Sequence, residues 1–118
     1  YMFAAPINIF SLAYPETTSN WSNRFQMFRT QNMWTFILLD SYNGRLWQVQ
    51  YSTQDLDNLF CIPINKYELV SDNEKCIFSI QPLTSMYQYY LINDNTGDMW
   101  KFQWSTKGDD YRWIEKFK

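Results

Sequence analysis

Histidine is absent from the sequence. This absence removes the commonest general base, the commonest zinc ligand and every nucleophile that a histidine activates, such as a Ser-His or Cys-His pair. The two cysteines cannot complete a four-thiolate metal site by themselves. We therefore expect a protein without enzymatic activity, without a cofactor and without a bound metal.

Glycine, proline and an excess of positive charge are also lacking. Three glycines and four prolines among 118 residues argue against a disordered chain. The net charge of −2 provides no basic surface for nucleic acid. No run of 18 apolar residues is long enough for a transmembrane helix. A chain of this length buries about two-thirds of its unfolded surface, which is enough for the core of one domain.

Aromatic residues are abundant, at 20 % of the chain, and they mark an internal repeat. Residues 34–51 return as residues 87–104, so that Trp47 corresponds to Trp100 at an offset of 53 residues. The same offset aligns Gly44 with Gly97, Leu38 with Leu91 and Phe25 with Phe78. Each copy has an apolar run, a turn with glycine and an alternating run, which is the pattern of a β-hairpin.

The alternation predicts the faces of the hairpin. Trp47, Val49 and Tyr51 share one side of a strand, and we expect this side to face the core, as for Trp100, Phe102 and Trp104 in the second copy. In the preferred register, Leu38 lies opposite Trp47 and Asp40 opposite Arg45, although a two-residue Asn-Gly loop keeps the same faces. The residues expected to shape the turns and the hairpin are Asp40, Asn43, Gly44, Trp47, Gly97 and Trp100.

The sequence predicts an all-β fold of two four-stranded antiparallel meanders, related by the repeat and packed as a sandwich or small barrel. A propeller is disfavoured because two blades cannot close a ring. The expected strands are 24–31, 34–40, 45–53, 58–64, 76–84, 87–94, 99–106 and 111–117. The expected organisation is an N-terminal apolar arm (1–20) and one β domain (21–118), which comprises repeat one (21–65), a connector (66–75) and repeat two (76–118).

The second strand of each copy is apolar on both sides. In an antiparallel strand with one solvent-exposed side, apolar and polar residues should alternate. The arm, another copy of the chain or a protein partner could cover the extra apolar side. The candidate interaction surface consists of Ile37, Leu39, Tyr42, Tyr90 and Ile92. The arm itself is either an ordered segment or the remnant of a secretory signal, with Ser11 and Ala13 as small residues before a cleavage point.

Other candidate sites have ordinary structural explanations. Residues 93–98 superficially resemble a calcium loop, but counting back from Gly97 places Ile92 at the first ligand position, so hairpin turn chemistry is favoured. Glycoside hydrolysis needs two carboxylic acids, and the repeat does not supply an equivalent pair because Asp40 corresponds to Asn93. Cys61 and Cys76, expected on adjacent strands, either form a disulfide or are buried thiols.

Residues 36–51, which read FILLDSYNGRLWQVQY, resemble a motif of small bacterial proteins of the Bacteroides type. Those proteins carry a Leu-Asp-x-x-x-Gly-x-x-Trp-Gln-Val-Gln hairpin once or twice after a signal peptide. The resemblance covers 24–51 and 78–104, and it departs at Asn93, where Asp is usual, and at Lys101-Phe102. It implies a repeated hairpin and an exported or surface-associated protein rather than a cytoplasmic one, and it implies no activity.

These observations favour a non-catalytic interaction module that binds a protein partner or another copy of itself. A lectin-like domain that binds glycans or small ligands through exposed aromatic rings is the first alternative. Its candidate rings are Trp21, Trp34, Tyr42, Tyr87, Tyr90 and Trp113. An inhibitor or immunity protein is a further alternative, which fits the small size and the acidity.

Overall fold

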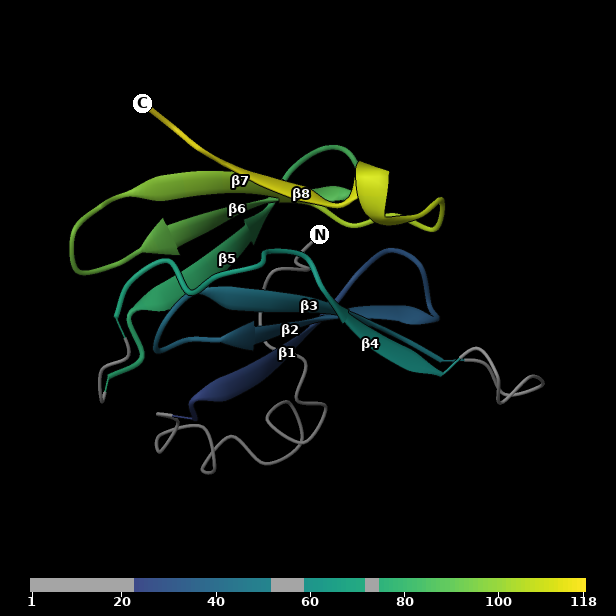
Figure 1. The fold of residues 1–118 in the computed structure, drawn as a ribbon, viewed down its shortest axis with the longest axis horizontal. Coiled ribbons are helices and arrows are strands. Elements are labelled where there is room, and N and C mark those ends of the chain that lie inside the picture. Colours follow the sequence, from purple (N-terminus) through teal and green to yellow (C-terminus); the bar gives the residue numbers. More distant parts are fainter. Residues whose placement is uncertain (1–22, 52–58, 72–74) are drawn as a thin grey trace.

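The computed structural model describes residues 23–51, 59–71 and 75–118, which form two four-stranded antiparallel sheets (Figure 1). In each sheet the strands lie in chain order. The first sheet contains β1 (Phe25–Arg29), β2 (Thr35–Asp40), β3 (Arg45–Gln50) and β4 (Phe60–Pro63). The second contains β5 (Phe78–Pro82), β6 (Gln88–Asn93), β7 (Met99–Gln103) and β8 (Trp113–Lys116), and the short 3₁₀ helix η3 (Asp109–Tyr111) precedes β8.

The predicted fold of two four-stranded meanders is therefore confirmed. The sheets stack face to face and are not closed into a barrel, so the sandwich is the correct one of the two predicted arrangements. The predicted arm (1–20) lies outside the described residues. Within the described part of the chain, no helix is long and apolar enough to cross a membrane.

The two sheets have the same register, residue for residue. Leu38 pairs with Trp47 in the first sheet, and Leu91 pairs with Trp100 in the second. The offset of 53 residues also relates the outer pairs, since β1 pairs with β2, and β3 with β4, in the same register as β5 with β6 and β7 with β8. The predicted pairing of Asp40 with Arg45 is confirmed.

The turn between β2 and β3 depends on a glycine in the left-handed region. Gly44 has a φ of +84°, and its N–H donates to the carbonyl oxygen of Asp40 over 2.9 Å. Gly97 occupies the same place after β6, with a φ of +81° and a bond of 2.7 Å to the Asn93 carbonyl. Only glycine adopts this conformation without a Cβ clash, which explains why both copies have it.

Each sheet has two sides of different character, because side chains alternate along a strand. We call the side with the repeated tryptophan the aromatic face and the other side the reverse face. The aromatic face of the first sheet contains Phe25, Met27, Trp34, Phe36, Leu38, Trp47, Val49 and Tyr51. The aromatic face of the second sheet contains Phe78, Ile80, Tyr87, Tyr89, Leu91, Trp100, Phe102 and Trp104.

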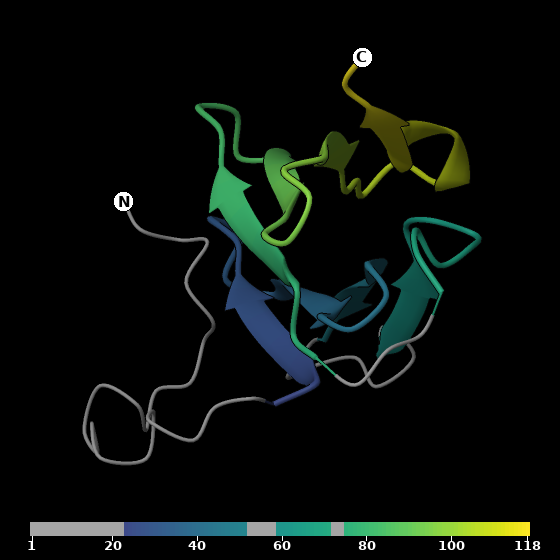
Figure 2. The same ribbon diagram turned by 90° about the vertical axis from the view of Figure 1, so that its left-hand side faces the viewer.

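The two sheets stack head to tail: the aromatic face of the second packs on the reverse face of the first. Ile37, Leu39 and Leu46 on the first sheet are each 0 % exposed. They share one core with the aromatic face of the second sheet, where Phe102 and Trp104 are also 0 % exposed. In Figure 2, β5 lies above β1 and β8 lies above β4, so equivalent strands of the two sheets are stacked.

This arrangement corrects two predictions. Ile37 and Leu39 do not belong to an interaction surface, because the second sheet covers them completely. The aromatic face of the first sheet does not face the core, and Trp47 is half-buried on the outer side while its equivalent Trp100 is 7 % exposed inside. The physical reason is that the reverse face of the first sheet is itself apolar, with Phe28, Ile37, Leu39 and Leu46, so this side can be buried against the aromatic face of the second sheet.

A buried glutamine holds the two sheets in place. The amide nitrogen Nε2 of Gln48 donates to the carbonyl oxygen of Ser105 over 2.9 Å. Its Oε1 accepts from the Ser105 N–H at 3.1 Å and from Arg112 Nε at 2.8 Å. Gln48 is 0 % exposed, so these bonds between sheets satisfy a polar group that would otherwise be costly to bury.

Candidate protein-binding face

The aromatic face of the first sheet presents several apolar and aromatic side chains to solvent. Phe25 is 53 % exposed, Met27 37 % and Tyr51 36 %. Phe36, Leu38 and Trp47 between them are half-buried. Large contiguous apolar surfaces of this kind mark interaction sites more often than isolated exposed hydrophobic residues do.

The rings of this face pack on each other. The Phe25 and Trp47 ring centroids are 6.4 Å apart, and those of Trp34 and Tyr51 are 5.4 Å apart in an edge-to-face arrangement. Phe36 stacks on Tyr51 at 5.9 Å. These contacts hold the side chains in fixed positions, so a partner that binds here meets a largely pre-ordered surface.

Two of these three ring contacts recur at the equivalent positions of the second sheet. Phe78 and Trp100 lie 5.8 Å apart, in the positions equivalent to Phe25 and Trp47. Tyr87 and Trp104 lie 4.7 Å apart, equivalent to Trp34 and Tyr51. A surface that one repeat buries against a β-sheet is therefore presented outward by the other repeat.

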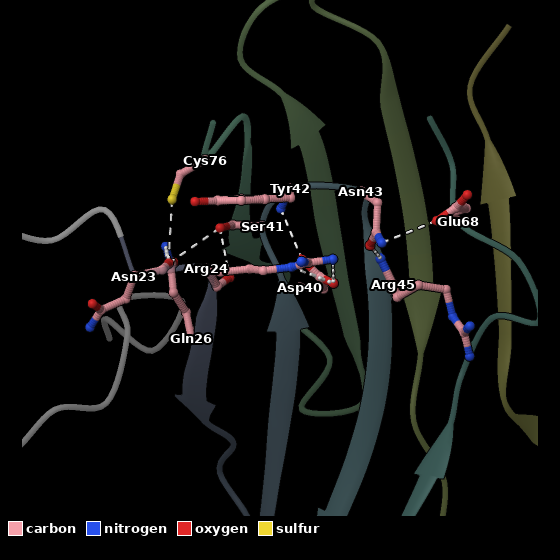
Figure 3. A network of polar contacts seen from close by, with 10 residues as sticks. All are labelled: Asn23, Arg24, Gln26, Asp40, Ser41, Tyr42, Asn43, Arg45, Glu68 and Cys76. Carbon is pink, nitrogen blue, oxygen red and sulfur yellow. Dashed lines mark hydrogen bonds and ion pairs between the residues drawn. The ribbon is translucent and has the colours of Figure 1, made fainter. Parts of the chain in front are cut away.

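A polar network borders the aromatic face at the turn between β2 and β3 (Figure 3). The guanidinium group of Arg24 donates to both carboxylate oxygens of Asp40 over 3.0 to 3.1 Å, and Asp40 is only 3 % exposed. Asp40 also accepts the backbone N–H of Tyr42 at 3.1 Å. The Arg24 guanidinium lies 5.4 Å from the Phe25 ring centroid and 4.9 Å from that of Tyr42. This network fixes one end of the face.

Arg45 lies on the aromatic face next to Trp47, with its guanidinium 5.0 Å from the Trp47 ring centroid. Its Nε is buried and has no hydrogen-bond acceptor among the described residues. Buried donors in folded proteins nearly always have a partner, whether protein or water.

The two cysteines are free and belong to different sheets. Cys61 is on β4, which pairs with β3, and Cys76 comes just before β5, where its Sγ lies 3.3 Å from the Asn23 carbonyl oxygen. The prediction that their strands are adjacent is wrong. Cys61 is exposed and Cys76 is half-buried, so the alternative of buried thiols is wrong for Cys61. Partial desolvation raises the pKa of the Cys61 thiol, which disfavours the nucleophilic thiolate at neutral pH.

The remaining residues of the predicted surface lie on two opposite sides of the molecule. Tyr42 is half-buried beside Arg24 at the border of the first sheet. Tyr90 and Ile92 are half-buried on the outward reverse face of the second sheet. One continuous surface made of all five predicted residues therefore does not exist, and the sequence-based prediction missed Phe25, which is the most exposed ring of the aromatic face.

The calcium-like segment 93–98 forms a hairpin turn whose polar atoms bond to one another. The side-chain Oδ1 of Asn93 accepts the backbone N–H groups of Asn95 and Thr96 at 2.9 and 3.1 Å. The hydroxyl of Thr96 donates to Asp98 over 3.1 Å. Among the described residues, no group of three or more Cys, Asp or Glu side chains is arranged to hold a metal ion.

Comparisons of the chain with protein-family models, with curated proteins and with solved structures give no match. The function must therefore be inferred from the geometry of the two sheets and their outward faces.

Proposed function

We propose that this protein is a non-catalytic binding module, and that a protein partner binds the aromatic face of its first sheet. One observation supports this proposal above all. The face that the second sheet buries is presented outward by the first, with Phe25 more than half exposed where Phe78 is 3 % exposed. Aromatic residues and methionine are enriched at protein interfaces, and this face contains both.

Glycan binding, which the sequence also allowed, lacks such support. Sugar stacking needs the flat side of an exposed ring with free polar groups beside it. On this face the Trp34 and Tyr51 rings pack edge to face, and at the other end of β2 the Asp40 carboxylate is bonded to Arg24. Titration of the tryptophan fluorescence with the sugars of a glycan array should give no saturable change.

Photo-cross-linking tests the proposal in the cells that produce the protein. A benzoylphenylalanine residue replaces Phe25 on the aromatic face, and in the control it replaces Tyr67, which is 77 % exposed but lies outside the face in the connector. We expect discrete adducts from position 25 that disappear when Trp47→Lys is added, and none of them from position 67. Absence of any adduct at position 25, or the same adducts at both positions, would contradict the proposal.

A further inference from the structure

We propose that the partner is a second copy of this chain, which docks the reverse face of its second sheet on the aromatic face of the first sheet. This inference rests on the proposed function, since it names the occupant of the same face. It commits to a head-to-tail contact, in which two different surfaces of the chain meet, rather than to a two-fold contact between identical surfaces.

The chain already contains one interface of this type. Inside the molecule, the aromatic face of the second repeat packs on the reverse face of the first, and the two repeats have the same strand register. The two faces that point outward are the other members of the same pair, the aromatic face of the first sheet and the reverse face of the second. A second copy can therefore continue the stack by repeating the contact that the fold has already formed.

The reverse face of the second sheet retains much of the apolar character that the internal interface uses. Where the first sheet has Ile37, Leu39 and Leu46, the second has Tyr90, Ile92 and Met99, and all three are half-buried. Polar residues lie beside them: Gln81 and Lys101 are both paired with Tyr90, where the first sheet has Phe28 and Gln48. A mixed apolar and polar surface is the usual composition of a reversible interface, whereas the internal interface is part of the core.

The shape of the molecule favours a closed assembly over an open filament. In Figure 2 the sheets are close together at β1 and β5 and diverge toward β4 and β8, so each pair of sheets forms a wedge. Wedges that stack head to tail turn by the same angle at each step, and they close into a ring where these angles add up to a full turn. Rings of four-stranded sheets have roughly four to eight members, so two to four copies of this two-sheet chain would complete one.

Sedimentation velocity and light scattering on the full chain test this inference over a wide range of concentrations. We expect the wild type to form a discrete assembly of two to four copies. Trp47→Lys removes the aromatic face, and Ile92→Lys removes the reverse face, so each variant should be monomeric. An equimolar mixture of these two variants should form a complex of one copy of each, because one intact pair of faces remains. Tyr67→Lys, outside both faces, should assemble as the wild type does.

Several outcomes would overturn the inference. A wild type that is monomeric at every concentration excludes it, as does an Ile92→Lys variant that still dimerises, because the aromatic faces would then meet each other. If the chain assembles only after residues 1–20 are deleted, the arm rather than a second copy would be the occupant of the aromatic face. The purified chain could be monomeric while position 25 forms adducts with a different protein in cells. This result would support the proposed function but would reject a second copy of the chain as the partner.

Discussion

Phe25 and Phe78 provide a matched pair of substitutions for the head-to-tail stacking, because the same side chain occupies the same register position in each repeat. Phe25 pairs with Asp40 on the first sheet, and Phe78 pairs with Asn93 on the second. Their exposed fractions are 53 % and 3 %. The change to alanine is chemically identical at both sites, so any difference in its cost reports the surroundings of the ring.

The expected costs differ by more than the error of the measurement. Phe78→Ala removes a fully packed ring and leaves a cavity beside Trp100, which typically costs about 3 to 5 kcal/mol. Phe25→Ala leaves no enclosed cavity and loses about half of the burial of one phenylalanine, which is about 1 kcal/mol. We therefore expect the free energy of unfolding to fall by at least about 2 kcal/mol more for Phe78→Ala than for Phe25→Ala.

Urea denaturation followed by far-UV circular dichroism measures both free energies. The experiment should be repeated at several protein concentrations, because association of copies would stabilise the folded state by mass action. Equal costs at the two positions, or a larger cost at Phe25, would refute the assignment of the aromatic face of the first sheet to the outside of the molecule.

Three further predictions concern the turn, the core and the contact between sheets. Gly44→Ala should cost about 1 to 3 kcal/mol more than Gly97→Ala in urea denaturation, because both strain a positive φ but only at Gly44 would the new Cβ meet other side chains, at 2.9 to 3.1 Å; equal costs would contradict this. Burial raises the pKa of Tyr89 to about 12 from 10.0, so the unfolded chain loses this proton first. The free energy of unfolding should therefore decline as the pH rises from 10 toward 12, by up to about 3 kcal/mol, and Tyr89→Phe should flatten this decline in a pH series of denaturation curves. An unchanged slope would show that Tyr89 is not the group responsible. Gln48→Ala should cost about 2 to 3 kcal/mol because it leaves buried backbone groups unpaired, while the exposed Gln81→Ala should cost less than about 0.5 kcal/mol, and similar values would argue against the bonds between sheets.

The strands and their register could be predicted from the sequence because both depend on local rules. Alternation with a period of two defines the sides of each strand, and Gly44 and Gly97 mark turns that need a positive φ. The constant offset between the copies then fixes the same register twice. These features depend on residues near one another in the chain, so no knowledge of the packing between sheets is needed.

The packing of the faces could not be predicted from alternation, because alternation defines two sides without saying which neighbour each side meets. The expectation that both aromatic faces turn inward assumes that the repeats are related like two halves of a symmetric sandwich. One signal for the real arrangement is visible in the sequence. On the reverse face, the first repeat has Phe28 where the second has Gln81, and Gln48 where the second has Lys101. Such an asymmetry favours burial of the reverse face of the first repeat rather than that of the second.

The cysteines illustrate the same limit. Cys61 and Cys76 flank the connector in the sequence, and proximity in the chain suggested adjacent strands. The connector instead leads from the last strand of one sheet to the first strand of the next, and these strands pair with different neighbours. Strand order within a meander follows from the sequence, but the step from one sheet to another does not.

Nuclear Overhauser effects in solution test the head-to-tail stacking most directly. The account predicts cross-peaks from the methyl groups of Ile37 and Leu39 to the aromatic rings of the second sheet, and none from the Trp47 indole of the same chain to those rings. Dilution into the monomer, or isotope labelling of one copy, separates contacts within the chain from contacts between copies. Cross-peaks within one chain between the Trp47 and Trp100 rings, with Ile37 and Leu39 silent toward the second sheet, would contradict the account.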